Sequence, residues 1–240
     1  MLMRKLRWLL PVLAVWGDAV PVPAGTGETH ETVRIAVFSA EHIGRALPDG
    51  WKPLGFPLIS GKTSYSVVGD SRFEAVIHAR SAAGSGGLVY PMSLRSDSYP
   101  LLSWSWKISR TVPGSRAALR DGDDFPARVI VSFKELEKQK GSVYDRALCY
   151  VWGEGDPVDS FVPNPYHDHV VTVVAASGGD QAGDWMQLSR NVVDDYVTAF
   201  GAQPGWISAV TVMTDGDDTG VDIEAWYGPI VFSSPPAETR

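Results

Sequence analysis

The sequence predicts a mainly β protein: a two-sheet antiparallel β-sandwich of jelly-roll type, with one short helix near residues 191–200. Short segments rich in β-branched and aromatic residues recur along the 240 residues. Turn-forming residues, among them 24 Gly and 17 Pro, separate these segments. Many short strands divided by such turns are typical of sandwiches and jelly rolls.

The first residues predict a secretory signal peptide over 1–24. Arg4, Lys5 and Arg7 precede a short apolar run that ends at Trp16. A charged segment followed by about 7–15 apolar residues is the pattern of such peptides, and the run is too short to span a bilayer. We therefore expect a periplasmic or secreted protein whose residues 25–240 form a single domain, with its core over about 32–232.

Ten segments have the composition of strands, and residues 102–108 show the clearest alternation. There, Trp104 and Trp106 fall on one face and Lys107 on the other, because side chains alternate along a strand. Residues 39–63 are rich in Pro and Gly and predict a long loop. The predicted strands are 32–38, 65–68, 73–79, 88–94, 102–108, 127–133, 147–152, 170–175, 207–213 and 223–232.

The helix is predicted from a change of period. Val192, Val193, Tyr196 and Phe200 follow helical intervals, and Gly201 comes directly after them. Glycine just beyond the last helical residue is a common way to end a helix.

Composition excludes several classes of protein. A net charge of −7 without a basic run argues against nucleic-acid binding, which needs clustered Lys and Arg. The sequence contains no stretch of 18 apolar residues, so we expect no integral membrane span after signal removal. Cys149 is the single cysteine, so the fold does not depend on disulfides.

Two acidic segments are candidate ligand sites. Asp215 and Asp217 lie in an Asp-rich turn that predicts either a plain hairpin connection or a calcium site, although the EF-hand spacing is not met. Asp123 and Asp124 precede a strand, and Arg128 follows four residues after Asp124. Adjacent carboxylates repel each other unless a cation lies between them. This spacing predicts either a buried Asp–Arg pair that braces the strand or the polar floor of a ligand pocket.

Further candidates lie on loops and strands. Asn164 and Tyr166 occupy a long loop before a strand, where binding residues are common. Trp226 and Tyr227 are adjacent on the last predicted strand, so they point to opposite faces and one of them belongs to the core. Lys107 points away from Trp104 and Trp106, toward the polar candidates. The predicted ligand-binding set is Lys107, Asp123, Asp124, Arg128, Asn164, Tyr166, Asp215, Asp217 and Trp226.

The order of these motifs resembles the bacterial family catalogued as domain of unknown function 3047. Members of that family are exported proteins without an assigned activity, so the resemblance implies export and supplies no catalytic residues. The layout also resembles, more weakly, that of jelly-roll carbohydrate-binding modules. The stretches that carry the family resemblance are PDGWKP at 48–53, YPLLSWSWK at 99–107, GDD at 122–124 with ARV at 127–129, NPY at 164–166, MTDGDDTG at 213–220 and AWYG at 225–228.

Together these observations predict an exported protein that binds a glycan or another hydroxyl-rich envelope molecule. Two alternatives remain open. One is a polysaccharide hydrolase or lyase that uses Asp123 or Asp124 beside Arg128, so the sequence leaves open whether the protein is an enzyme. The other is a structural interaction protein of the envelope. Calcium is the one cofactor that the sequence suggests.

Overall fold

The structure is a computed structural model that describes residues 31–54, 63–134 and 146–235. These residues form two β-sheets and one α-helix, α1 (Val192–Phe200), together with two short 3-10 helices, η1 (Ala40–His42) and η2 (Arg120–Gly122). The predicted signal peptide at 1–24 lies outside the described residues. The strands are β1 (Thr32–Arg34), β2 (Lys52–Leu54), β3 (Thr63–Asp70), β4 (Glu74–Ala82), β5 (Gly87–Arg95), β6 (Leu101–Ile108), β7 (Arg128–Lys134), β8 (Arg146–Gly153), β9 (Phe161–Pro163), β10 (Val170–Ser177), β11 (Met186–Asn191), β12 (Trp206–Met213) and β13 (Asp222–Ser233).

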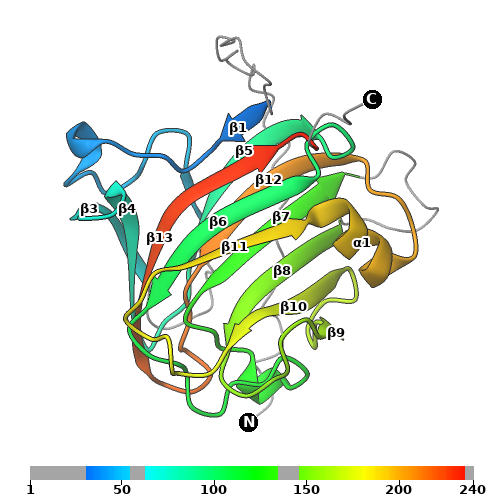
Figure 1. Cartoon of the computed structure of the whole chain (residues 1–240). Helices are drawn as coiled ribbons and strands as arrows, with labels where there is room; N and C mark the ends of the chain where they lie inside the picture. Colours follow the sequence, from blue (N-terminus) through cyan, green and yellow to red (C-terminus); the bar gives the residue numbers. More distant parts are fainter. Residues whose placement is uncertain (1–30, 55–62, 135–145, 236–240) are drawn as a thin grey trace.

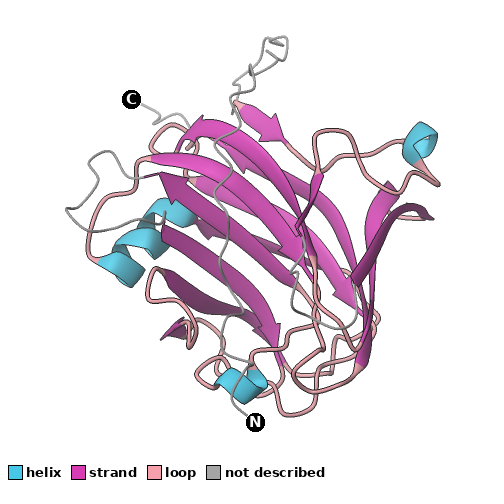
Figure 2. Cartoon of the chain, turned by 180° about the vertical axis from the view of Figure 1, so that it is seen from behind, coloured by secondary structure: helices cyan, strands magenta, loops and turns pink. Residues whose placement is uncertain are grey.

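The two curved sheets pack face to face, which confirms the β-sandwich (Figure 1). The six-stranded sheet has the order β11-β6-β13-β4-β3, and β1 also pairs with β13. The seven-stranded sheet has the order β2-β5-β12-β7-β8-β10-β9. Loops gather at the end of the sandwich where η2 lies, as Figure 2 shows from behind.

One strand pair departs from the antiparallel pattern that the sequence predicts. β8 and β10 run parallel, whereas the other pairs within the described sheets are antiparallel. A parallel neighbour requires a long connection that returns the chain to the same end of the sheet. Residues 154–169 supply it, and β9 within them pairs with the far edge of β10.

The core lies between the sheets and is rich in large aromatic side chains. The predicted alternation in β6 is confirmed, since Trp104 and Trp106 are at most 1% exposed and point inward. The Trp104 ring lies 5.1 Å from the ring of Tyr150, and the Trp106 ring lies 5.9 Å from that of Trp152. β6 of one sheet therefore packs against β8 of the other.

The seven-stranded sheet is also buried on its outer face, the face turned away from the other sheet. Ile130 and Cys149 lie there and form a second apolar cluster with Phe125, and the half-buried Tyr166 packs against this cluster. This burial explains why the segment of β7 is apolar on both faces. Burial also raises the pKa of the Cys149 thiol to about 12.

Helix α1 forms where the sequence predicts it. The Asn191 side chain accepts hydrogen bonds from the backbone N–H groups of Val193 and Asp194, at 3.1 and 3.3 Å. Gly201 ends the helix with a φ of 67°, a left-handed conformation that glycine adopts without steric cost. The buried ring of Tyr196 packs 4.8 Å from that of Phe133, so the helix is anchored to the core.

The sequence prediction misses three edge strands and makes the first strand too long. β2 falls within the predicted loop, and Pro53 is tolerated there because β2 is an edge strand. β9 has only three residues, and β11 alternates weakly, so neither has the pattern of a strand. The predicted strand at 32–38 is regular only over β1, after which Phe38 makes an isolated bridge to Ala75.

Candidate functional site

Two groups of polar and aromatic side chains are candidates for function, and the first lies where β7 begins and β12 ends. Arg128 is the register partner of Met213 in these antiparallel strands. Residues just before β7 therefore meet residues just after β12. We call Asp123, Asp124, Arg128, Asp215 and Asp217 the carboxylate cluster.

Arg128 is the centre of the carboxylate cluster. Its Nε and Nη2 donate to the two oxygens of Asp215 at 3.0 and 2.7 Å, and its Nη1 donates to Asp123 Oδ1 at 3.1 Å. The guanidinium also lies 4.6 Å from the centre of the Phe125 ring. Arg128 and both carboxylates are at most 1% exposed. This arrangement is the buried Asp–Arg brace that the sequence predicts as one alternative, with Asp215 as a second partner.

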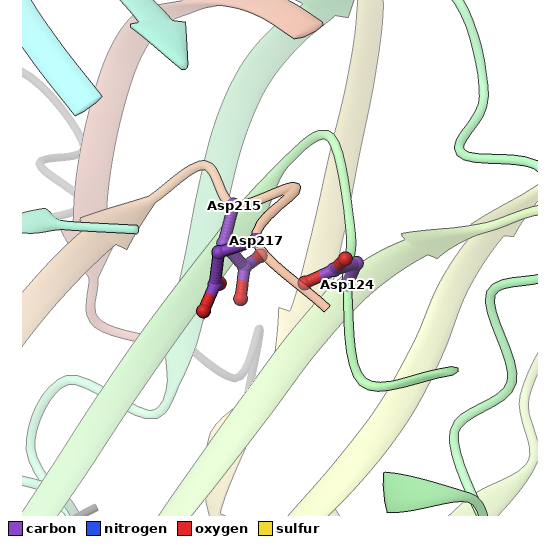
Figure 3. Close-up of side chains that lie close together, drawn as sticks. All are labelled: Asp124, Asp215 and Asp217. Carbon is purple, nitrogen blue, oxygen red and sulfur yellow. The ribbon is translucent and has the colours of Figure 1, made fainter. Parts of the chain in front are cut away.

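Asp124 has a different environment, although it is adjacent to Asp123. Its Oδ2 accepts from the backbone N–H and the hydroxyl of Thr219, at 2.6 and 2.8 Å. Its Oδ1 is buried and has no hydrogen-bond partner among the described residues. Asp124, Asp215 and Asp217 each place one carboxylate oxygen within 4.8 Å of the others, and Figure 3 shows the three side chains gathered together.

Burial dominates the electrostatics of the cluster. It raises the pKa of both Asp123 and Asp215, and the nearby Asp124 carboxylate adds to both shifts. The positive charge of Arg128 opposes the shifts because it favours the ionised acids. Burial and mutual repulsion thus favour the protonated forms of Asp123 and Asp215, and the Arg128 guanidinium favours their ionised forms.

Asn164 joins the carboxylate cluster, and Tyr166 lies beside it. The Asn164 side chain opposes the rise that burial causes in the pKa of the nearby Asp123, and its Oδ1 accepts from the backbone N–H groups of Tyr166 and His167, at 3.0 and 3.1 Å. The Tyr166 hydroxyl donates to the Arg120 carbonyl at 2.9 Å, and its ring lies under the Arg120 guanidinium. The loop 164–169 is thereby held against the loop that precedes β7.

Lys107 and Trp226 belong to the second group, on the outer face of the six-stranded sheet. Trp226 of β13 is the register partner of Lys107 on β6 and of His78 on β4. Trp185 immediately precedes β11, next to β6. We call Trp185, Lys107, Trp226 and His78 the aromatic row.

Close contacts connect the members of the aromatic row. The His78 ring is stacked on that of Trp226, with 4.9 Å between centroids and 10° between planes. Lys107 Nζ lies 4.6 Å from the centre of the Trp226 ring and 5.1 Å from that of Trp185. All four side chains are half-buried, whereas the neighbouring Tyr227 is fully buried, as the alternation on this strand predicts.

Polar groups and one glycine complete this face. Glu224 Oε2 lies 2.8 Å from His78 Nε2, and Trp185 Nε1 donates to Asp70 Oδ2 at 3.1 Å. The ring of Phe73 lies over Gly228, where an added Cβ would come within 3.1 Å of that ring. Gly228 therefore lets the turn between β3 and β4 pack closely on the sheet beside Trp185.

Sequence reasoning misses His78, Trp185 and Glu224. The alternation in β4 offers a signal for His78, because the buried Ile77 and Ala79 on either side of it leave it pointing outward. Nothing local indicates that His78, Lys107 and Trp226 are neighbours, since that depends on the order of the strands.

The fold and the sequence motifs together place the chain in a family. It belongs to the family described as protein of unknown function (DUF3047), whose model matches residues 49–231. The resemblance that the motifs predict is thereby confirmed. None of the curated proteins matches the chain.

Several solved structures are similar to the chain at low identity. A family 11 carbohydrate-binding module of the cellulase Lic26A-Cel5E from Clostridium thermocellum is 11% identical, with a TM-score of 0.46 over 88% of this chain and 99% of that one. A family 29 carbohydrate-binding module from Piromyces equi is 9% identical, with a TM-score of 0.36 over 87% of this chain and 95% of that one. The enzymatically active domain of tailspike protein 4 from bacteriophage CBA120 is 12% identical, with a TM-score of 0.40 over 83% of this chain and 21% of that one. At these identities the similarities identify no ligand.

Within the described residues, no helix is both long and apolar enough to cross a membrane.

Proposed function

We propose that this protein is exported and binds a glycan through the aromatic row on the outer face of its six-stranded sheet. The observation that carries the proposal is the pair of half-buried indoles, Trp185 and Trp226, on either side of Lys107. Tryptophan side chains that stay partly exposed on the outer face of a sheet, with an apolar ring and a polar tip, are common in binding surfaces.

The chemistry of the row suits a hydroxyl-rich ligand. Indole rings offer flat apolar surface to the C–H groups of a sugar ring, while nearby polar side chains serve its hydroxyls. Lys107 supplies donors, Glu224 supplies acceptors, and His78 contributes a ring nitrogen of either kind. A few convergent polar groups beside aromatic surface are the usual composition of a small-molecule site.

The carboxylate cluster has a supporting role in this proposal. Asp123, Asp124, Arg128 and Asp215 are at most 1% exposed, so they hold the loops at the end of the seven-stranded sheet in place. A hydrolase or lyase that used Asp123 or Asp124 would need the covering loops to open before a polysaccharide reached either carboxylate. For this reason we propose binding rather than catalysis.

The test is isothermal titration of the mature protein against a panel of soluble glycans. We expect at least one glycan to bind, and Trp226→Ala to weaken that binding by about tenfold or more, as loss of a central aromatic contact does. Trp206→Ala is the matched control, because Trp206 is 40% exposed on the seven-stranded sheet.

Two results would overturn the binding proposal. One is a panel without any binding, and the other is equal loss of affinity in the Trp226 and Trp206 variants.

Export is tested separately. The basic residues and apolar run at the N-terminus support cleavage near residue 24. We expect N-terminal sequencing of the protein from a periplasmic or culture fraction to begin close to residue 25. Recovery of the uncleaved chain from the cytosol alone would contradict this part of the proposal.

A further inference from the structure

The carboxylate cluster has a feature that the brace by Arg128 does not explain. Asp124 lies in the loop before β7, whereas Asp215 and Asp217 lie in the turn after β12. One oxygen of each nevertheless lies within 4.8 Å of the others (Figure 3). Like charges at such distances repel unless something of opposite charge lies between them. Arg128 bonds to Asp215 and Asp123, and Asp124 bonds to Thr219.

The hydrogen bonds leave particular oxygens with unused capacity. Asp124 Oδ2 accepts two donors from Thr219, whereas Asp124 Oδ1 is buried and accepts none. Asp215 Oδ1 accepts from Phe125 N and Arg128 Nε, whereas Oδ2 accepts only from Arg128 Nη2. A carboxylate oxygen has two lone pairs, so Asp124 Oδ1 and Asp215 Oδ2 both retain room for a ligand bond.

The charges of these side chains also favour a bound cation. Asp123, Asp124 and Asp215 are at most 1% exposed, and Asp123 and Asp215 share the guanidinium of Arg128. Asp217 brings a half-buried carboxylate to the same place. Buried ionised groups without a counter-charge are costly, and a bound cation removes that cost.

We propose that Asp124, Asp215 and Asp217 bind one calcium ion. Calcium prefers oxygen ligands at about 2.3–2.6 Å, so oxygens separated by up to about 5 Å can all contact one ion. It also tolerates irregular geometry and a shared carboxylate, which suits Asp215 with its bond to Arg128. The ion joins the loop before β7 to the turn between β12 and β13, in parallel with the bonds from Thr219 to Asp124.

The experiment uses chelator-treated mature protein, titrated with calcium chloride by calorimetry and followed by thermal unfolding. We expect one site per chain and a higher Tm with calcium, because a ligand that binds only the native state stabilises it. Magnesium should bind more weakly, since it needs closer and more regular ligands.

Variants locate the site. Asp217→Asn and Asp124→Asn should each weaken calcium binding by about tenfold or more, because each removes a charged ligand. Asp222→Asn is the control, since Asp222 is an exposed aspartate at the start of β13. Asp217 is half-buried whereas Asp124 is fully buried, so the Asp217 variant gives an answer even where Asp124→Asn fails to fold.

Three outcomes overturn the proposal: no heat and no change in Tm at about 1 mM calcium, binding that survives Asp217→Asn, or equal binding of magnesium. Trp226→Ala should bind calcium as the unchanged protein does. The calcium site and the glycan proposal therefore stand or fall separately.

Discussion

Arg128 illustrates how one residue can hold two distant parts of the chain together. Its fork of donors binds Asp123 just before its own strand and both oxygens of Asp215, which is 87 residues further along. Bidentate bonds between guanidinium and carboxylate are among the stronger hydrogen bonds in proteins. Once buried, such a group is costly to break, because each remaining partner keeps its charge without compensation.

Replacing Arg128 tests this dependence. We expect Arg128→Met to lower the free energy of unfolding by about 3–5 kcal/mol, because Asp123 and Asp215 would stay buried without their cation. Urea unfolding followed by tryptophan fluorescence measures the change. Arg80→Met is the control, since the Arg80 side chain is 70% exposed and 3.8 Å from Glu224, so its loss should cost less than about 1 kcal/mol. Equal stability of the two variants would contradict a structural role for Arg128.

The sequence predicts this brace only in part, and the reason is visible at single residues. The close spacing of Asp123, Asp124 and Arg128 indicates an acid–base pair at the start of the strand. It does not reveal that Asp123 is the partner, that Asp124 turns to Thr219, or that Asp215 completes the pair. Those contacts depend on β7 and β12 being neighbours, which no local pattern encodes.

Like β6, α1 is predicted to within one residue of its limits. Its signals are local: a period of 3.6 residues, a side chain that caps the first turn and a glycine after the last. Strand β11 gives a weaker signal, because its apolar face consists of two half-buried residues, Met186 and Leu188. Edge strands are specified by the neighbour to which they bond more than by their own composition.

The N-cap of α1 supports a prediction at this scale. Asn191→Ala removes the acceptor for the N–H groups of Val193 and Asp194, so we expect a loss of about 1 kcal/mol in the free energy of unfolding. Chemical denaturation gives the value. Thr198→Ala, at an exposed position within the same helix, should be nearly neutral because alanine favours the helical conformation. A larger loss for Thr198→Ala than for Asn191→Ala would refute the capping role.

At the scale of the whole molecule, alternation is enough to predict a sandwich, but not which faces become functional. The pattern in β6 correctly turns Lys107 away from the core, and adjacency correctly separates Trp226 from Tyr227. The sequence prediction nevertheless combines Lys107 and Trp226 with the acids of the other sheet in one site. The order of strands places these two residues in the aromatic row and leaves the acids in the carboxylate cluster. Strand order arises from the packing of the complete chain, so the predicted single site divides into two.

The response of the molecule to pH follows from His167, which lies close to the loop before β7. The pKa of His167 is lowered to about 4: burial is the largest cause, His169 and Arg120 also lower it, and Asp168 opposes them. In the unfolded chain the imidazole has a pKa of about 6.5. Between these values the unfolded state takes up a proton that the native state does not. His167 therefore makes the native state less stable as pH falls from about 7 to about 4. The raised pKa values of Asp123 and Asp215 act in the opposite direction, because these acids bind protons in the native state first.

His167→Gln separates the two contributions. The variant keeps the acids but lacks the imidazole, so its stability should fall less than that of the unchanged protein when the pH is lowered from about 7.5 to about 5. We expect the stability difference between the two proteins to shift by about 1–2 kcal/mol over this range, below the unscreened value because the ring is only partly buried. Urea unfolding at several pH values gives the difference directly. Between about pH 8 and pH 9 it should stay constant, since the imidazole is neutral in both states there. The prediction is contradicted if the stability difference between the two proteins is the same at pH 5 and pH 8. The His167 ring would then take up a proton as readily in the folded protein as in the unfolded chain.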